Sequence, residues 1–254
     1  MNWLSCYTLF KKEVLRWVKV WLQTVLAPVV TAWLYLLVFG HVLEGRVEVF
    51  DGVSYTQFLI PGLLMMTVIQ NAFANTSSSM IQSKVMGSIV FILLPPFSAL
   101  EMFFAYIGAA VMRGLAVGVG VFALAYWYAD VPIDNFFIIL LFAVLGSYTL
   151  GALGLIAGMW AEKFDQIAAF QSFLIVPLTF LSGVFYSINS LPEMWAALSR
   201  WNPFFYMIDG FRYGFFGQSD QPVLFSFLAM AAAALLLTVV CLVLLQRGYK
   251  LRDA

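Results

Sequence analysis

The single histidine of the chain, His41, limits the chemistry that the sequence can support. A metal centre or a serine–histidine catalyst needs partner residues at a defined spacing, and the sequence has neither a Cys/His cluster nor a Gly-x-Ser-x-Gly turn. A phosphate-binding P-loop needs a glycine directly before its lysine, and no lysine of this chain follows a glycine. The sequence therefore predicts no catalytic residue, no metal and no cofactor in this chain, which we do not expect to be an enzyme.

Arg113 is an intramembrane charge by sequence, because it interrupts a long apolar segment. Ion-coupled carriers place ionisable residues in the membrane, usually in pairs. Glu101 precedes Arg113 on the same expected helix, but about 18 Å of helical rise separates them, so they cannot form such a pair. Gly114, Gly118 and Gly120 would let helices approach closely here. Two interpretations remain: a guanidinium capped by backbone carbonyls, or a latch or substrate contact.

A segment rich in proline and aromatic residues follows the fifth apolar stretch. Ser182 and Gly183 lie inside an apolar run, which predicts that a helix loosens there. Ser190 followed by Pro192 is typical of a helix start, and Pro203 opens a second short helix. We therefore expect two short outer-surface or re-entrant helices before the last span.

The second of these short helices carries Asp209 and Arg212, whose spacing of three would allow the side chains to pair. An aromatic belt at the membrane interface is the alternative explanation for the many rings. A belt does not account for two proline-initiated helices within one hairpin.

The elements that position these residues must be membrane-embedded. The chain has 254 residues, of which 63% are hydrophobic and 10% charged, and its mean hydropathy is +0.93. A soluble domain carries about 25% charged residues, so this composition excludes one, as it excludes a disordered chain. With 13 Lys+Arg against 13 Asp+Glu, the sequence offers no basic surplus, and we expect no nucleic-acid partner.

We predict an all-α membrane protein with six transmembrane helices, because each span needs about 20 apolar residues and none of the runs alternates as barrel strands do. The expected spans are about 20–42, 55–76, 100–128, 135–160, 166–187 and 221–246. Residues 20–254 would form one transmembrane domain.

Residues 85–100 could form a seventh span, but this stretch is short and Pro95-Pro96 breaks it. Six spans leave most cationic residues on the cytoplasmic side, with both termini, as the positive-inside rule expects. That side would hold Lys11, Lys12, Arg16, Lys19, Lys84, Lys163, Arg247, Lys250 and Arg252, against Arg46, Arg200 and Arg212 outside. A seventh span would move the C-terminal cations outside, so we expect a short cytoplasmic or re-entrant helix at 85–94.

Residues 1–19 are expected to form an amphipathic interfacial helix at the cytoplasmic surface. Apolar residues recur there at steps of three and four, at Trp3, Tyr7, Phe10, Val14, Trp17 and Trp21. The alternative is that this segment simply begins the first span.

The C-terminal block resembles the signature region of the ABC type-2 transporter permeases. The matching residues are Pro177, 181–185 (Leu-Ser-Gly-Val-Phe), Leu191-Pro192, Asn202-Pro203 and Asp209-Gly210-x-Arg212. The whole chain is similar to the YadH-type permeases of the bacterial inner membrane, through Tyr55-x-Gln57-Phe58-x-x-Pro61-Gly62, Arg113-Gly114 and Gln246-Arg247-Gly248. Relatives export polysaccharides, nodulation signals or drugs.

The resemblance implies a homodimer in the bacterial inner membrane, with a separate ABC ATPase that binds ATP and Mg. It implies that the N-terminal helix is a cytoplasmic elbow and that a coupling helix between spans 2 and 3 docks on the ATPase, through Lys84, Gly87, Ser88, Phe91, Leu93 and Leu94. It assigns an outer gate to Ser182, Gly183, Phe185, Pro192, Asn202, Pro203, Asp209 and Arg212. The acidic residue common after the coupling-helix glycine is missing here.

We therefore expect the permease subunit of an ABC transporter that exports a lipid-linked glycan or a hydrophobic small molecule. The alternative is a stand-alone channel or secondary carrier without an ATPase, whose marks would be intramembrane carboxylates or an inverted repeat. An intramembrane enzyme is a third alternative, but the sequence does not offer the catalytic residues that such an enzyme needs.

Overall fold

The computed structural model describes residues 3–43, 50, 52–94 and 97–251. Arg46, Pro95, Pro96 and Arg252, which entered the topology prediction, lie outside the described residues. The described chain is helical, and Phe50 and Val53 form an isolated β-bridge. This confirms the all-α prediction.

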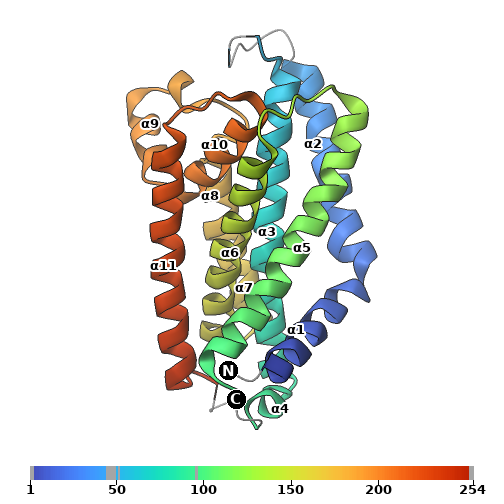
Figure 1. Cartoon of the computed structure of the whole chain (residues 1–254), viewed down its shortest axis with the longest axis vertical. Coiled ribbons are helices and arrows are strands. Elements are labelled where there is room, and N and C mark those ends of the chain that lie inside the picture. Colours follow the sequence, from blue (N-terminus) through green and yellow to red (C-terminus); the bar gives the residue numbers. More distant parts are fainter. Residues whose placement is uncertain (1–2, 44–49, 51, 95–96, 252–254) are drawn as a thin grey trace.

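Among the described residues, five helices are long and apolar enough to cross a membrane: Leu22–Leu43, Tyr55–Val85, Ala99–Tyr128, Phe136–Trp160 and Val223–Arg247. They correspond to α2 with the π-helical turn before it, and to α3, α5, α6 and α11 (Figure 1). The stretch expected as the fifth span is a shorter apolar helix, Phe164–Phe180, built from α7 (Phe164–Phe170), a π-helical turn (Gln171–Ile175) and α8 (Val176–Phe180).

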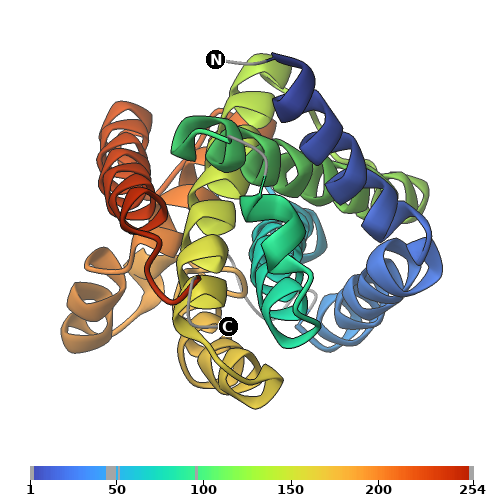
Figure 2. The same ribbon diagram turned by 90° about the horizontal axis from the view of Figure 1, so that it is seen from below.

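Helix α3 (Tyr55–Val85) is the central element, and α2, α5, α6, α7 and α10 pack around it (Figure 2). Its 31 residues correspond to roughly 46 Å of rise, more than the ~30 Å hydrocarbon core of a bilayer. Ser54 begins the helix with a capping box that includes Gln57. Most of its side chains are buried against the surrounding helices.

The short elements gather at two opposite ends of the bundle (Figure 1). Helix α1 (Trp3–Val18) and α4 (Ile89–Leu93) lie at the end where α11 finishes. Helices α9 (Glu193–Arg200) and α10 (Pro203–Phe216) lie at the other end. The helix starts predicted at Pro192 and Pro203 are confirmed, and Asn202 caps α10 through the amide of Phe204.

Two helices are interrupted by π-helical turns, each next to a proline. The turn Leu22–Leu26 precedes α2 (Ala27–Leu43), which contains Pro28. The turn Gln171–Ile175 precedes α8, which contains Pro177. Proline cannot donate the helical hydrogen bond, and a π-turn is one way a helix absorbs that defect. The sequence analysis did not predict these turns.

Helix α1 packs differently from the predicted apolar stripe. Trp17 of the stripe is buried, but Trp3 and Tyr7 are 74% and 59% exposed. The face against the bundle buries Leu9 and the carboxylate of Glu13. The periodicity located the helix, whereas packing against α5 decided which face turns inward.

Candidate functional site: a gate, a membrane cavity and a docking end joined by α3

Three sequence motifs that lie far apart in the chain meet at one end of the bundle. The Tyr55 hydroxyl on α3 donates to the Phe185 carbonyl at 3.0 Å, and the Arg212 Nη2 on α10 donates to the Gly183 carbonyl at 2.8 Å. The Arg212 guanidinium also lies over the Phe58 ring, with Cζ 3.8 Å from the ring centroid. The predicted outer-gate residues Gly183, Phe185 and Arg212 are therefore brought together, and the α3 motif holds them.

Glycine is required where this turn touches α3. Gly183 has a φ of +76°, a conformation that suits glycine because it has no side chain. A Cβ on Gly62 would lie 2.7 Å from the Val184 carbonyl oxygen and 3.2 Å from Arg212 Nη2. Ser182 is buried and its hydroxyl donates to the Thr179 carbonyl. The loosening predicted at Ser182-Gly183 is confirmed, since α8 ends at Phe180.

Asp209 and Arg212 do not form the predicted ion pair. Asp209 accepts hydrogen bonds from the backbone amides of Asp220 and Gln221, at 2.7 and 3.1 Å. These amides lie just before α11 (Val223–Arg247), which has no other cap there, so the carboxylate is drawn to them and away from the guanidinium. Burial raises the pKa of Asp209 to about 6. The two backbone amides and Arg212 lower this pKa, but their effect is smaller than that of burial.

Asp220 was missed by the sequence analysis. Its carboxylate accepts from the Ser187 hydroxyl at 2.5 Å, the Ile188 amide at 3.0 Å and the Asn189 side chain at 3.0 Å. Together with Asp209 it ties α10, the start of α11 and the turn at Ile188–Ser190 into one unit. An acidic residue shortly before the proline that begins an apolar helix was the available signal.

Three other predicted gate residues lie at the ends of the two short helices: Pro192, Asn202 and Pro203. Within the described residues, the structure records no hydrogen bond between them and Arg212 or its partners. Pro192 precedes α9, and Pro203 is the first residue of α10. Asn202 is buried and its Nδ2 donates to the Leu178 carbonyl at 2.6 Å, which fixes the hairpin to α8.

A partly open cavity of about 420 Å³ lies between α2, α3 and the α7–α8 segment. Arg113 of α5 reaches it, and its polar lining comes from Gln23, Thr31, Tyr35, Thr67, Gln70, Asn71 and Gln171. Both π-turns contribute to the wall, through Gln23 and Gln171. The volume is in the range of small-molecule binding sites, which is about 300–1,000 Å³.

Arg113 is held by a side-chain amide. Its Nη2 donates to Asn71 Oδ1 at 3.1 Å, so the backbone-carbonyl cap considered from the sequence is wrong. Asn71 is oriented by its own bond from Nδ2 to the Thr67 carbonyl at 3.0 Å. Gly114 lets α5 approach, because a Cβ there would lie 3.0 Å from the Val68 carbonyl and 2.9 Å from Ser147 Oγ.

At the far end of α3 lies the segment expected to couple to an ATPase. Gly87 has a φ of +67° and open space around it, and Ser88 precedes α4. Ile89 and Ile92 anchor α4 in the core, while Phe91 and Leu94 are 74% and 71% exposed and Leu93 is 39% exposed. A short helix that holds large apolar side chains in the open is typical of a protein interface.

Lys84, one of the residues expected at the ATPase contact, is a buried residue of α3. Its ammonium is buried and donates to the Met159 and Ala161 carbonyls, at 2.8 and 2.6 Å. It thus caps the C-terminus of α6, as cations often do. Lys250 supports the same helix end through Glu162, at 2.6 Å.

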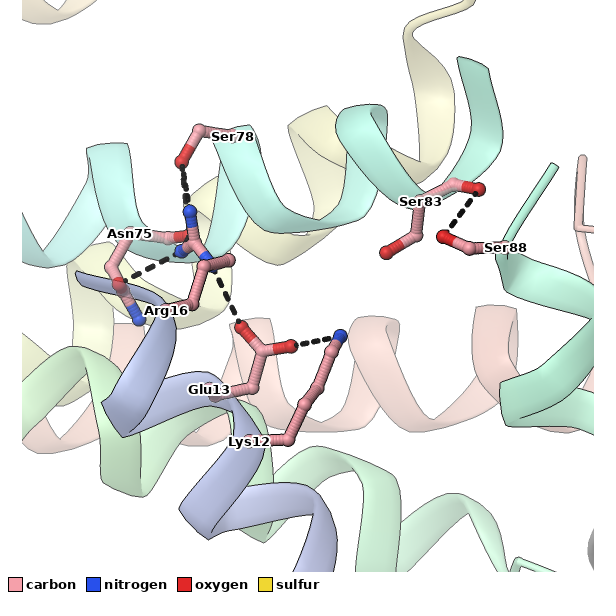
Figure 3. A network of polar contacts seen from close by, with 7 residues as sticks. All are labelled: Lys12, Glu13, Arg16, Asn75, Ser78, Ser83 and Ser88. Atoms are coloured by element: carbon pink, nitrogen blue, oxygen red, sulfur yellow. Dashed lines mark hydrogen bonds and ion pairs between the residues drawn. The ribbon is translucent and has the colours of Figure 1, made fainter. Parts of the chain in front are cut away.

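A polar network joins α1 to the same part of α3 (Figure 3). Glu13 is fully buried and accepts from Lys12 at 2.7 Å and from Arg16 at 3.3 Å. Arg16 Nη2 also donates to the Asn75 carbonyl at 2.7 Å and to Asn75 Oδ1 at 3.0 Å. The sequence alone did not single out Glu13, although an acid inside a basic amphipathic helix was the available signal.

The sequence comparisons agree with this architecture. The family model described as ABC-2 type transporter matches residues 5–216. The chain belongs to the ABC-2 type transporter family, whose members include transport permeases.

Among its relatives, the chain is 38% identical to the inner membrane transport permease YadH of Escherichia coli strain K12, over 100% of this chain and 99% of that protein. It is 25% identical to nodulation protein J of Rhizobium leguminosarum bv. viciae, over 86% of this chain and 83% of that one. It is 31% identical to the capsule polysaccharide export inner-membrane protein BexB of Haemophilus influenzae, over 43% and 42% of the two chains.

Proposed function

We propose that this chain is one half of a homodimeric exporter of the bacterial inner membrane, driven by a separate ABC ATPase. It would cross the membrane six times, with the Phe164–Phe180 helix as the fifth span, and residues 1–19 would be the elbow preceding a transmembrane domain at 20–254. The end with α1, α4 and the finish of α11 would face the cytoplasm. That end carries Lys11, Lys12, Lys163, Arg247 and Lys250, which agrees with the positive-inside rule.

One observation carries the proposal: within the described residues, α3 contacts the Gly183–Phe185 turn, Arg113, α1 and α4. Its first turns hold the Gly183–Phe185 turn and Arg212, its middle holds Arg113, and its last turns hold α1 and lead into α4. Because the helix is continuous and buried, a displacement of α4 by an ATPase would be passed to the gate. ATP and Mg would be held by the partner.

The docking contact would be apolar. Phe91 and Leu94 are exposed at the expected cytoplasmic end, and Gly87, Ser88 and Leu93 shape the segment around them. Lys84 would act indirectly, by fixing the end of α6. No acidic residue lies between Gly87 and Leu94, so burial of apolar side chains would supply most of the affinity.

For the substrate, the proposal is a lipid-linked glycan or a hydrophobic small molecule. Relatives named for capsule polysaccharide export and for nodulation support an amphiphilic or sugar-containing cargo. The membrane-level cavity, with amide and hydroxyl groups beside apolar ones, suits such a molecule.

The test is to purify the tagged chain in mild detergent and to assay the eluate for a co-purifying ATPase. Phe91→Glu should lose the ATPase, since a carboxylate would be buried in an apolar interface. Met194→Glu is the matched control, because Met194 is 70% exposed on α9 at the opposite end. A homo-oligomer without an ATPase that still moves cargo without ATP would overturn the proposal in favour of a stand-alone channel or carrier.

A further inference from the structure

Arg113 is a buried cation with an incomplete set of partners. The side chain is 8% exposed. A guanidinium has five N–H donors, and within the described chain the structure gives one hydrogen bond, to Asn71, and leaves Nε without an acceptor. No carboxylate of the described residues forms an ion pair with it. A buried charge that lacks a counter-charge is costly, so the site is incomplete as it stands.

The described surroundings of Arg113 do not cancel its charge. The charged side chain that acts on it electrostatically is another cation, Arg16, which is itself paired with Glu13. The cavity beside it is lined by amides and hydroxyls at Gln23, Thr31, Gln70 and Gln171, and no acidic residue is among the lining residues. These groups can donate hydrogen bonds to an anion. The complementary ligand is an oxyanion.

The Arg113 guanidinium is also held in a fixed orientation. Asn71 is locked by its bond to the Thr67 carbonyl, and the Thr67 hydroxyl is locked by the Leu63 carbonyl at 2.6 Å. Because Gly114 has no side chain, α5 packs closely against α3 at this level. A preorganised planar guanidinium binds phosphate or carboxylate with two parallel hydrogen bonds, which a flexible ammonium does not reproduce.

The rest of the cavity is suited to an apolar body. Ala32, Met66, Ala74, Val176 and Phe180 complete its wall, and both π-turns open onto it. Such turns occur frequently at functional sites, because they break the regular helix surface. A molecule bound here would place a charged head at Arg113 and its apolar part against α2 and α8.

We propose that Arg113, positioned by Asn71, binds the oxyanion head group of an amphiphile, with the apolar part of that molecule in the cavity between α2, α3 and α8. The inference rests on the proposed transport function and narrows its cargo to an anionic amphiphile. The head group could belong to the cargo or to an anionic phospholipid of the bilayer.

The experiment measures direct binding to the purified complete chain in phosphatidylcholine nanodiscs without ATP. The probes are dodecyl phosphate and dodecyl maltoside, which share the chain and differ in the head group. The wild type should bind dodecyl phosphate more tightly than dodecyl maltoside. Arg113→Gln should weaken the binding of dodecyl phosphate by at least about tenfold, because a charge-assisted hydrogen bond is lost. The binding of dodecyl maltoside should not change.

Arg247→Gln is the matched control, since it removes the same charge at the exposed end of α11 and should leave both probes unchanged. Arg113→Lys should recover part of the affinity, because the charge remains and the planar fork is lost. If the wild type does not distinguish the two probes, or if Arg113→Gln and Arg247→Gln behave alike, the inference is overturned, even if the glutamine variant at 113 folds poorly.

Adding phosphatidylglycerol to the nanodiscs identifies the source of the head group. If phosphatidylglycerol competes with dodecyl phosphate, and the competition requires Arg113, the site binds a bilayer phospholipid. If phosphatidylglycerol does not compete, the site binds a diffusible cargo. Both results require the oxyanion site. Because binding is measured without ATP, failure of this inference is distinct from failure to find an ATPase partner.

Discussion

The guanidinium of Arg212 on α10 lies over the ring of Phe58 on α3, with 3.8 Å between Cζ and the ring centroid. Both side chains are fully buried, and Arg212 Nη2 at the same time donates to the Gly183 carbonyl. One cation thus joins three segments that are distant in sequence. Desolvated cation–π contacts contribute about 2 kcal/mol, and hydrogen bonds to charged groups contribute about 1.5–3 kcal/mol.

Arg212→Lys should lower the stability of the protein although it keeps the charge. Lysine cannot stack as a plane on Phe58 while it donates to Gly183, so we expect a loss of about 2–3 kcal/mol in the free energy of unfolding. Thermal unfolding in detergent measures it. Arg200→Lys, at an exposed position of α9, is the control and should change little. Equal melting temperatures for the two variants would contradict the stacking argument.

Gly62→Ala should disrupt the contact between α3 and the Gly183–Phe185 turn, and more strongly than Gly40→Ala disturbs its own surroundings. A Cβ at position 62 would approach the Val184 backbone to 2.7 Å, which can be relieved only by moving the turn. At position 40 the new atom would meet the movable side chain of Thr56, and alanine also favours the helix by about 1 kcal/mol. Accessibility of a cysteine placed at Val184 would report the displaced turn. An unchanged labelling rate in Gly62→Ala would disprove the close approach.

Glu13→Ala should loosen α1 from the bundle. The buried carboxylate orients Arg16 towards Asn75, so its removal leaves a cation that is partly buried without its partner. We expect a loss of about 1–3 kcal/mol, since Arg16 and Lys12 keep partial access to solvent. Hydrogen exchange of α1 is the measurement, and Lys11→Ala, on the exposed face, is the control.

The hairpin formed by α9 and α10 should become more stable as the pH falls from about 7.5 to about 5. Burial raises the pKa of Asp209 from 3.8 to about 6, so the folded hairpin binds a proton at a pH where the unfolded chain does not. Stability therefore increases as the pH drops through about 6 and levels off below about 4. Asp209→Asn should flatten this dependence, as followed by hydrogen exchange of α10. A slope that persists in the variant would assign the titration to another group.

The sequence by itself determined the helical class, the places where most helices begin and the family. These properties are local or additive: hydrophobic runs set the long helices, and Ser54, Asn202 and Pro203 act on the backbone next to them. The motifs around Tyr55, Gly183 and Arg212 could likewise be recognised as a set, because the resemblance depends on residue order and spacing.

Only the tertiary structure decided which polar groups face one another. Asp209 was expected to pair with Arg212 but caps the start of α11, Lys84 caps α6, and Arg113 is held by Asn71. In an apolar medium a buried polar group without a partner is costly, and the partner is set by which helix ends and side chains come within about 3 Å. That choice depends on helix packing across long sequence separations, which neither periodicity nor spacing encodes.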